Sequence, residues 1–480
     1  MSTPSLSTLP EELQIHILGY IYKYSLIDLR LVSHTFSRLI TPIIFRAIRV
    51  RAYRDEPQRF LNIAMTPHLR CHVRDVTCDT WTGSFPTEKR LELVDKFFEA
   101  IPSICVFPKL DTLNIRLERD GFHMYHNTQY RLLEMLFRCM EGSWQVHNYI
   151  GRDTTSSPKV SGQQAKTEVS RPLKTLSISN LVDISSVKAM LSFQSVMNSG
   201  ALKDLRISVA DLNTEKCCQG VHHDLLETVL SPRIAGNLQV LSLFSWASWG
   251  WFPNMDFRLV GANDLPNLKV LALGQFEFSQ WWQVEWIGSL GIEKLYLDEC
   301  TVLHSDRNRA AISEEDTEPA KKNAWREGST YHTHTRWHHI FEHWAHAMPN
   351  LRVFKIGQGW DMDDSCSWKA IDPTYEGDFY EHVEEDHEAI SNHSKIPTTS
   401  TLSTGIRWYG PEAAQANAAV FPYVEQIKGF KGFGHTYTDS PGHGKDFMNV
   451  SSEEKERDRK AFAEFLTVVD TRRTGFVDKE

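Results

Sequence analysis

The sequence of 480 residues contains no long apolar run. A membrane-spanning helix needs about 20 consecutive apolar residues, so no such helix is expected. The first residues also lack a basic segment followed by an apolar stretch, and a secretory signal peptide is therefore not expected either. The eight cysteines are scattered and never form a Cys-x-x-Cys pair, which excludes a small disulfide scaffold and a zinc module with paired cysteines. These absences predict a protein of the cytoplasm and/or nucleus, with reduced thiols and no membrane contact.

An excess of basic residues is also missing. The chain has 52 Lys and Arg against 61 Asp and Glu, which gives a formal net charge of −9. Proteins that bind nucleic acid neutralise phosphates with a basic patch, so nucleic acid is not an expected partner. The hydrophobic fraction of 41% and the charged fraction of 24% are ordinary for a soluble globular protein. A chain of this length and composition can bury a large core.

Catalytic motifs are absent as well. Residues 434–445 are rich in glycine and end in Gly444-Lys445, but Asp446 follows where a P-loop has Ser or Thr. Asp439 occupies the place of the first P-loop glycine. Neither a G-x-S-x-G nucleophile elbow nor an H-x-E…C-x-x-C deaminase signature occurs. We therefore predict a non-catalytic protein without a cofactor.

The densest group of possible metal ligands is a set of histidines in a helix predicted over residues 337–348. On that helix His339, His343 and His346 share one face, so a zinc site is one interpretation. The other is an amphipathic helix whose histidines lie largely on the solvent side. Its buried stripe would be Trp337, Ile340, Phe341, Trp344 and Met348. Because no H-E-x-x-H motif and no further ligand accompany the histidines, we predict no metal site.

The most informative stretch is the first fifty residues, where the apolar spacing predicts three short helices. Pro10 is expected in the first turn of the first helix, and the second helix is expected to start near Ser25. The third should follow Ser33 and end at Pro42. Helices this short are marginal alone, and their apolar residues lie on more than one face. This pattern indicates a module that completes its core with a partner.

These residues carry a resemblance to a known family, the F-box. The segments that carry it are Leu9-Pro10-x-Glu12-Leu13, Asp28-Leu29-Arg30-Leu31-Val32-Ser33, Phe36 and Phe45-Arg46. The resemblance implies a helical module over residues 1–50 that docks on the Skp-family adaptor of SCF-type ubiquitin ligases, and through it on a cullin. The adaptor-contact or packing residues that it implies are Leu9, Pro10, Leu13, Ile17, Leu29, Val32 and Phe36. The alternative is an N-terminal helical cap whose apolar residues pack into the following domain.

A six-residue phrase, L-x-x-L-x-ϕ with ϕ apolar, returns seven times in the rest of the chain. It starts at Leu110, Leu173, Leu202, Leu238, Leu268, Ile292 and Leu351. A degraded eighth copy lies in residues 68–80. The phrase is typical of the strand segment of a leucine-rich repeat. Between the copies, helices are predicted over residues 91–101, 130–140, 187–197, 225–230, 281–290 and 337–348.

The predicted fold class is therefore α/β: a small N-terminal three-helix F-box followed by an irregular leucine-rich-repeat solenoid, with parallel strands on its concave face and helices on its convex face. A doubly wound α/β domain is the alternative. The solenoid is expected over residues 51–360, with polar insertions at 151–172 and 304–330. Residues 361–405 are expected to form an acidic, flexible insertion, more simply a solvated loop than a site for a basic partner. Residues 406–480 should complete the solenoid with a capping helix.

Side chains that point outward from the predicted strands form a mixed surface suited to a protein target. The residues predicted to contact that target are Arg116, Arg206, Phe244, Trp246, Tyr296, Asp298 and Lys355. Trp246 is expected in a loop after a strand, where packing beneath the loop is favoured over binding. Together with the F-box resemblance, this surface predicts a substrate-recognition subunit of an SCF-type ubiquitin ligase with an unknown target. The alternative is a leucine-rich scaffold that binds the adaptor without a role in degradation.

Overall fold

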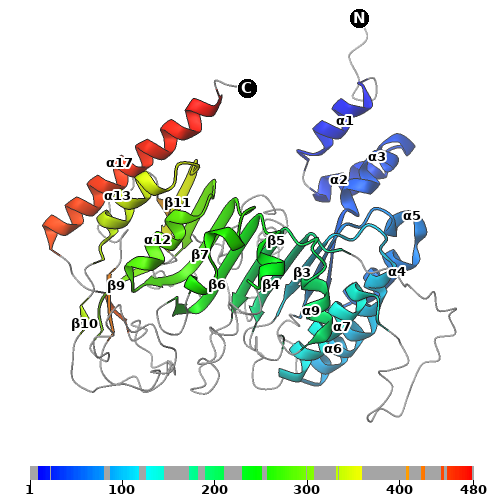
Figure 1. The fold of residues 1–480 in the computed structure, drawn as a ribbon. Coiled ribbons are helices and arrows are strands. Elements are labelled where there is room, and N and C mark those ends of the chain that lie inside the picture. The colour runs from blue at the N-terminus through cyan, green and yellow to red at the C-terminus, as the bar shows by residue number, and fades with distance from the viewer. Residues whose placement is uncertain are drawn as a thin grey trace, which may run out of the picture. The chain divides into compact units, whose positions relative to one another are not determined.

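A computed structural model of the chain describes its helices, its strands and some of the segments between them (Figure 1). The described residues are 9–21, 23–80, 87–117, 126–144, 172–181, 187, 190–209, 230–250, 257–298, 300–306, 331–332, 335–358, 407–409, 423–426, 445–447 and 451–477. Contacts divide the chain into two compact units, Met1–Ser177 with Met190–Ser199, and Ile178–Ala189 with Gly200–Glu480.

The first unit begins with the three predicted helices. They are α1 (Glu11–Leu18), α2 (Lys23–Arg30) and α3 (His34–Ile44). Their shared core consists of Leu18, Leu26, Leu39 and Ile40, with five half-buried apolar side chains packed against it. Ser33 caps α3 as predicted, because its Oγ accepts a hydrogen bond from the backbone N–H of Phe36 at 3.2 Å. The module therefore has a small core of its own.

Two predictions about prolines in this module are wrong. Pro10 is the N-cap of α1 and does not lie in its first turn. Pro42 does not end α3, which continues through it to Ile44. A proline inside a helix loses one backbone hydrogen bond. The turn continues nevertheless, because Phe45 N–H donates to the carbonyl of Thr41 at 3.1 Å.

The fold is α/β with a mostly parallel sheet. In the first unit the strands β1 (Ala47–Arg51), β2 (Asp75–Asp79) and β3 (Thr112–Arg116) pair in parallel and in chain order. In the second unit the same holds for β5 (Asp204–Val209), β6 (Val240–Trp249), β7 (Val270–Phe278), β8 (Lys294–Asp298) and β11 (Val353–Gln358). β4 (Thr175–Leu181) contains the residues at which the units divide. β12 (Arg407–Tyr409) pairs antiparallel with β11.

A second group of strands continues from the end of β7. β9 (Thr301–Asp306) pairs in parallel with the last residues of β7 and with β13 (Tyr423–Gln426). β10 (Tyr331–His332) pairs antiparallel with β9, and β14 (Lys445–Phe447) pairs antiparallel with β13. The expected insertion at residues 304–330 therefore begins inside a strand, which corrects its boundary. Residues 151–171 and 361–405 lie outside the described residues.

The repeated phrase predicts the strands correctly. Each strand begins at the third position of its phrase, and the first, fourth and sixth positions are buried. The fourth and sixth share one face because side chains alternate along a strand. The degraded copy forms β2, with Val76 and Cys78 buried. β1 is a further copy that was missed, with Ile48 and Val50 buried in the same manner, so the sheet starts within the range expected to be purely helical.

Helices separate these strands. In the first unit they are α4 (Glu56–Met65), α5 (Pro67–Arg70), α6 (Thr87–Ala100), the 3-10 helix η2 (Ile101–Val106), α7 (His126–Glu141) and α9 (Leu191–Met197). In the second unit they are α11 (Pro232–Ala235), η4 (Phe257–Leu259), η5 (Ala262–Asp264), α12 (Trp281–Ser289), α13 (Trp337–Ala347) and α17 (Ser452–Val477). The predicted helices are observed with shifted ends, except that most of the one at 225–230 lies outside the described residues.

α17 lies alongside α13 in Figure 1. It begins as predicted with a capping box, in which Ser451 Oγ accepts from Glu454 N–H at 3.2 Å and Glu454 Oε2 accepts from Ser451 N–H at 3.4 Å. Phe465 of α17 packs on Phe341 of α13 and on Phe354 of β11, with ring centroids 5.7 Å and 5.0 Å apart. The C-terminal helix therefore covers the last strand and the last helix of the repeat series.

Candidate functional site

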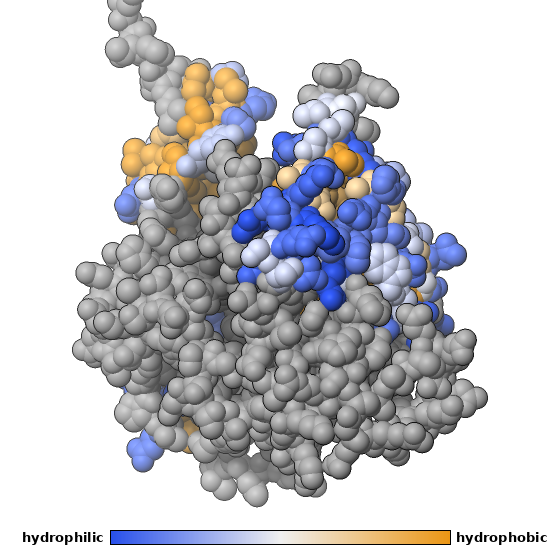
Figure 2. Space-filling view, turned by 90° about the vertical axis from the view of Figure 1, so that its left-hand side faces the viewer, coloured by the Kyte–Doolittle hydropathy of each residue, from blue (hydrophilic) through white to orange (hydrophobic). Residues whose placement is uncertain are grey.

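The N-terminal helices carry an exposed apolar surface. Leu13 and Ile17 of α1 are 50% and 38% exposed, and Leu31 and Val32 in the turn before α3 are 80% and 70% exposed. Figure 2 shows apolar side chains gathered on this module as an orange area at the upper left. Such a concentration of exposed apolar side chains makes this small helical module a candidate interaction site.

The residues implied by the F-box resemblance divide into two groups. Pro10, Leu13, Ile17 and Val32 are exposed and available to a partner. Leu29 and Phe36 are half-buried and pack against the shared core, and Leu9 is half-buried. The exposed apolar residues that the resemblance did not single out are Ile15, Tyr20, Ile27 and Leu31. The apolar surplus on several helix faces was the sequence signal that could have found them.

An ion pair between Glu11 and Arg38 joins α1 to α3. Arg38 Nη1 and Nη2 donate to Glu11 Oε1 and Oε2 at 3.0 Å and 2.7 Å, a two-pronged contact between residues 27 positions apart. The hydrogen bond from Arg38 lowers the pKa of Glu11, and its partner raises the pKa of Arg38. Both side chains are exposed, so the pair contributes little to stability.

On the outer face of the strands in the first unit, three charged side chains form a row that is shielded from solvent. Arg51, Asp79 and Arg116 occupy the same register position on β1, β2 and β3 and are all buried. Arg51 Nε donates to Glu56 Oε1 at 2.9 Å, and burial lowers the pKa of Arg116. The prediction of Arg116 as an accessible target contact is therefore wrong, because its guanidinium belongs to an internal charge row.

A second polar contact lies at the other end of the same strands. Asn114 Nδ2 donates to Asp75 Oδ1 at 2.8 Å. Burial and, to a lesser extent, the neighbouring carboxylate of Asp111 raise the pKa of Asp75 to about 6. The first unit thus holds a carboxyl group that changes charge near neutral pH.

In the second unit the predicted target contacts differ in accessibility. Phe244 and Tyr296 are 7% and 4% exposed, which contradicts the prediction that they face a partner. Tyr296 packs with Val270 and Ala272 on the outer face of the strands, and burial raises the pKa of its hydroxyl. Apolar neighbours across the parallel strands are the physical reason for this cluster, and a pattern read along one strand does not reveal them.

Of the four remaining predicted contacts, the structure describes the side chains of two, Arg206 and Lys355. Arg206 is half-buried and its Nη2 donates to Asp204 Oδ2 at 2.7 Å, while Lys355 is also half-buried. The side chains of Trp246 and Asp298 are outside the described residues.

Trp246 lies within β6 and not in the expected loop, because that strand runs to Trp249. Trp249 of the same strand is buried and its Nε1 donates to the carbonyl of Gly274 at 2.5 Å, so it is a packing residue.

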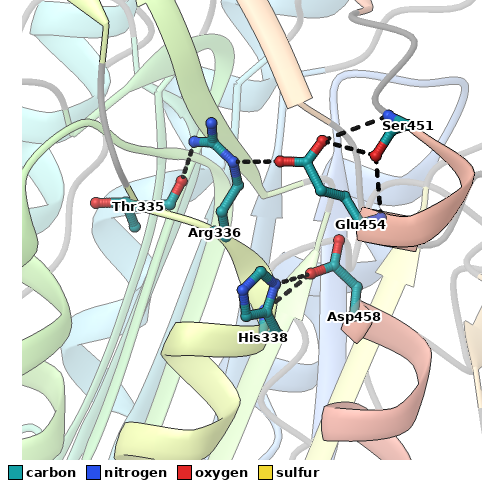
Figure 3. Close-up of polar contacts among 6 residues, drawn as sticks. All are labelled: Thr335, Arg336, His338, Ser451, Glu454 and Asp458. Atoms are coloured by element: carbon teal, nitrogen blue, oxygen red, sulfur yellow. Dashed lines mark hydrogen bonds and ion pairs between the residues drawn. The ribbon is translucent and has the colours of Figure 1, made fainter. Parts of the chain in front are cut away.

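The histidine helix contains a buried pair that sequence reasoning missed. The predicted apolar stripe of α13 is buried. His338, however, is also buried, and its Nδ1 lies 2.8 Å from Asp458 Oδ1 of α17 (Figure 3). Arg336 Nε donates to Glu454 Oε1 at 3.1 Å beside it. These contacts join the start of α13 to α17 across 120 and 118 positions of the sequence, respectively.

Among the described residues, no group of three or more His, Cys, Asp or Glu side chains is placed to hold a metal ion. No protein-family model matches the chain. No curated protein matches it either. Across the described ranges, every helix is too short or too polar to pass through a lipid bilayer.

Proposed function

We propose that the chain is a non-catalytic substrate-recognition subunit of an SCF-type ubiquitin ligase. In this proposal the N-terminal helices are an F-box that docks on the Skp-family adaptor, and the repeat region holds a target protein. The observation that carries the proposal is the exposure of Leu13, Ile17 and Val32, three of the residues at which the F-box resemblance implies adaptor contact.

Physical reasoning supports a partner for this surface. Burying apolar surface stabilises a complex by about 25 cal/mol per Å², so several leucine- and valine-sized side chains can provide the centre of an interface. The alternative, in which these helices cap the following domain, requires the same residues to be buried within the chain. Leu13, Ile17 and Val32 are exposed, which favours docking on a separate protein.

The repeat region supports the second half of the proposal. Consecutive strands pair in parallel, each begins at the same position of its phrase, and helices separate them. This is the arrangement expected of a leucine-rich-repeat solenoid. Its outward side chains, among them the half-buried Arg206 and Lys355, are the proposed target contacts. A receptor of this kind acts by effective concentration, because it keeps a bound target beside a ubiquitin-loaded enzyme.

Co-purification with the adaptor tests adaptor docking. We expect the full chain to recover purified adaptor, and Leu13→Asp with Val32→Asp to lose it, because each substitution places a charge in an apolar interface. A matched control is Leu191→Asp, which alters a leucine of α9 that is at least as exposed as Leu13 and Val32. Equal recovery by all three chains would contradict the proposal. A target half-life unchanged by removal of the chain would leave adaptor docking standing and point to a scaffold without a role in degradation.

A further inference from the structure

The first helix is held loosely by its neighbours. Of the α1 residues, Gln14 and Leu18 are the buried ones, and Leu18 is the member of the helix that joins the shared core. Gln14 makes its side-chain hydrogen bond within the same segment, from Nε2 to the carbonyl of Leu9 at 2.7 Å, while its Oε1 is buried without a partner. One buried apolar side chain anchors a helix but leaves it free to rotate about that point. A further contact must set its orientation.

The ion pair between Glu11 and Arg38 is placed to do this. Glu11 is the first residue of α1 and Leu18 is the last, so the ion pair and the apolar anchor lie at opposite ends of the helix. The two parallel hydrogen bonds of the pair impose a defined geometry, which a single hydrogen bond does not. Arg38 lies in α3, the helix that follows the turn carrying Leu31 and Val32. Two fixed points, one at each end, determine where the exposed residues of α1 face.

Resting on the proposed docking to the adaptor, we propose that the Glu11–Arg38 pair is a positioning device that orients α1 for its partner. The ion pair orients the side chains of Leu13 and Ile17 so that one partner can contact them and Val32 at the same time. A preorganised surface binds more tightly because the cost of ordering it has been met before association. Since the pair is exposed, its effect decreases as salt is added.

A double-mutant cycle on the full chain tests the inference. The dissociation constant for purified adaptor is measured by calorimetry for wild type, Glu11→Gln, Arg38→Gln and the double variant. Each is measured at 50 and 500 mM salt, because the Debye length falls severalfold between these concentrations. We expect each single variant to bind about fivefold more weakly at low salt, and the double variant no more weakly than the singles, because coupled partners are not additive. High salt should weaken wild type and leave the variants little changed.

The control is Arg59→Gln, which removes a somewhat more exposed ion pair between Arg59 of α4 and its N-cap residue Asp55. It should bind like wild type. All the chains should unfold at the same denaturant concentration, because exposed ion pairs contribute little to the free energy of unfolding. If the Glu11–Arg38 pair had only a structural role, its removal would leave the affinity for the adaptor unchanged. Single variants that bind within about twofold of wild type, or effects that multiply in the double variant, would overturn the inference.

These outcomes are separable from failure of the proposed function. If wild type binds the adaptor and Leu13→Asp with Val32→Asp abolishes binding, while the ion-pair variants bind normally, the docking proposal holds and the positioning inference is overturned. If wild type itself does not bind, both are overturned.

Discussion

Asp458 provides a helix cap for a helix that lies far from it in the sequence. The N-cap of α13 is Arg336, whose side chain makes no capping hydrogen bond. Instead, Asp458 Oδ1 accepts from the backbone N–H of His338 at 2.9 Å and lies 2.8 Å from its Nδ1 (Figure 3). Asp458→Ala therefore removes both a cap and the buried partner of an imidazole.

The size of the effect follows from these two losses. Removing an N-cap costs about 1 kcal/mol, and removing a hydrogen bond to a charged group costs about 1.5–3 kcal/mol. Because Asp458 and His338 are both buried, solvent does not replace either contact. We expect Asp458→Ala to lower the free energy of unfolding of this region by about 3 kcal/mol, and Asp458→Asn, which keeps the accepting Oδ1 but loses the negative charge, by about half as much.

Urea unfolding combined with hydrogen exchange of α13 and α17 measures this difference. The matched control is Asp470→Ala, which removes an exposed aspartate of the same helix that pairs with Arg473. It should change the free energy of unfolding by less than about 0.5 kcal/mol. If the two alanine variants differ by less than about 1 kcal/mol, the reasoning that Asp458 acts as a cap from a distant helix is refuted.

Two further predictions concern pH and backbone geometry. The pKa of Asp75 is raised to about 6, above its value in the unfolded chain. The stability that this group contributes is therefore present below the unfolded pKa and is lost as pH rises through about 6. Asp75→Asn should be more stable than wild type at pH 7 by about 1 kcal/mol, after allowance for solvent exposure, but not at pH 4. Thermal unfolding at both pH values checks this, and equal differences at the two would contradict it. Gly250 and Gly200 both have positive φ, but an added Cβ at Gly250 would lie 2.3 Å from the ring of Phe276, whereas Gly200 has open space. Gly200→Ala should cost about 1 kcal/mol and Gly250→Ala at least 2 kcal/mol more in chemical denaturation, and similar costs would show that the ring moves aside freely.

The sheet could be predicted from the sequence because its signal is local. A buried residue at the fourth and sixth positions of each phrase follows from the alternation of side chains along a strand, and each of the seven phrases lies at a strand. The short strands β9, β10, β12, β13 and β14 carry no such phrase and, like β1, were not predicted. The boundary of α3 was harder to predict, because Pro42 normally ends a helix, yet here the following turn is kept by the backbone hydrogen bond from Phe45 to Thr41. Local rules give the type of an element more reliably than its end.

The candidate sites depended on neighbours that the sequence does not reveal. Phe244 and Tyr296 stand at outward positions but are buried. Adjacent strands bring apolar residues such as Val270 beside Tyr296. His338 was expected with the solvent-facing histidines, and its partner is 120 residues away. Exposure on the N-terminal helices was easier to predict, since the surplus of apolar residues there exceeds what three short helices can bury.

The position of α17 also has a consequence for the order in which the protein can fold during synthesis. Phe341 and Phe354 pack against Phe462 and Phe465, which leave the ribosome roughly a hundred residues later. At about 5–20 residues per second, that interval lasts roughly 5–20 s. During this time β11 and α13 lack the aromatic partners that α17 provides. A polypeptide released before α17 is complete therefore carries an exposed aromatic surface, by which chaperones and proteases can distinguish it from a chain that includes α17.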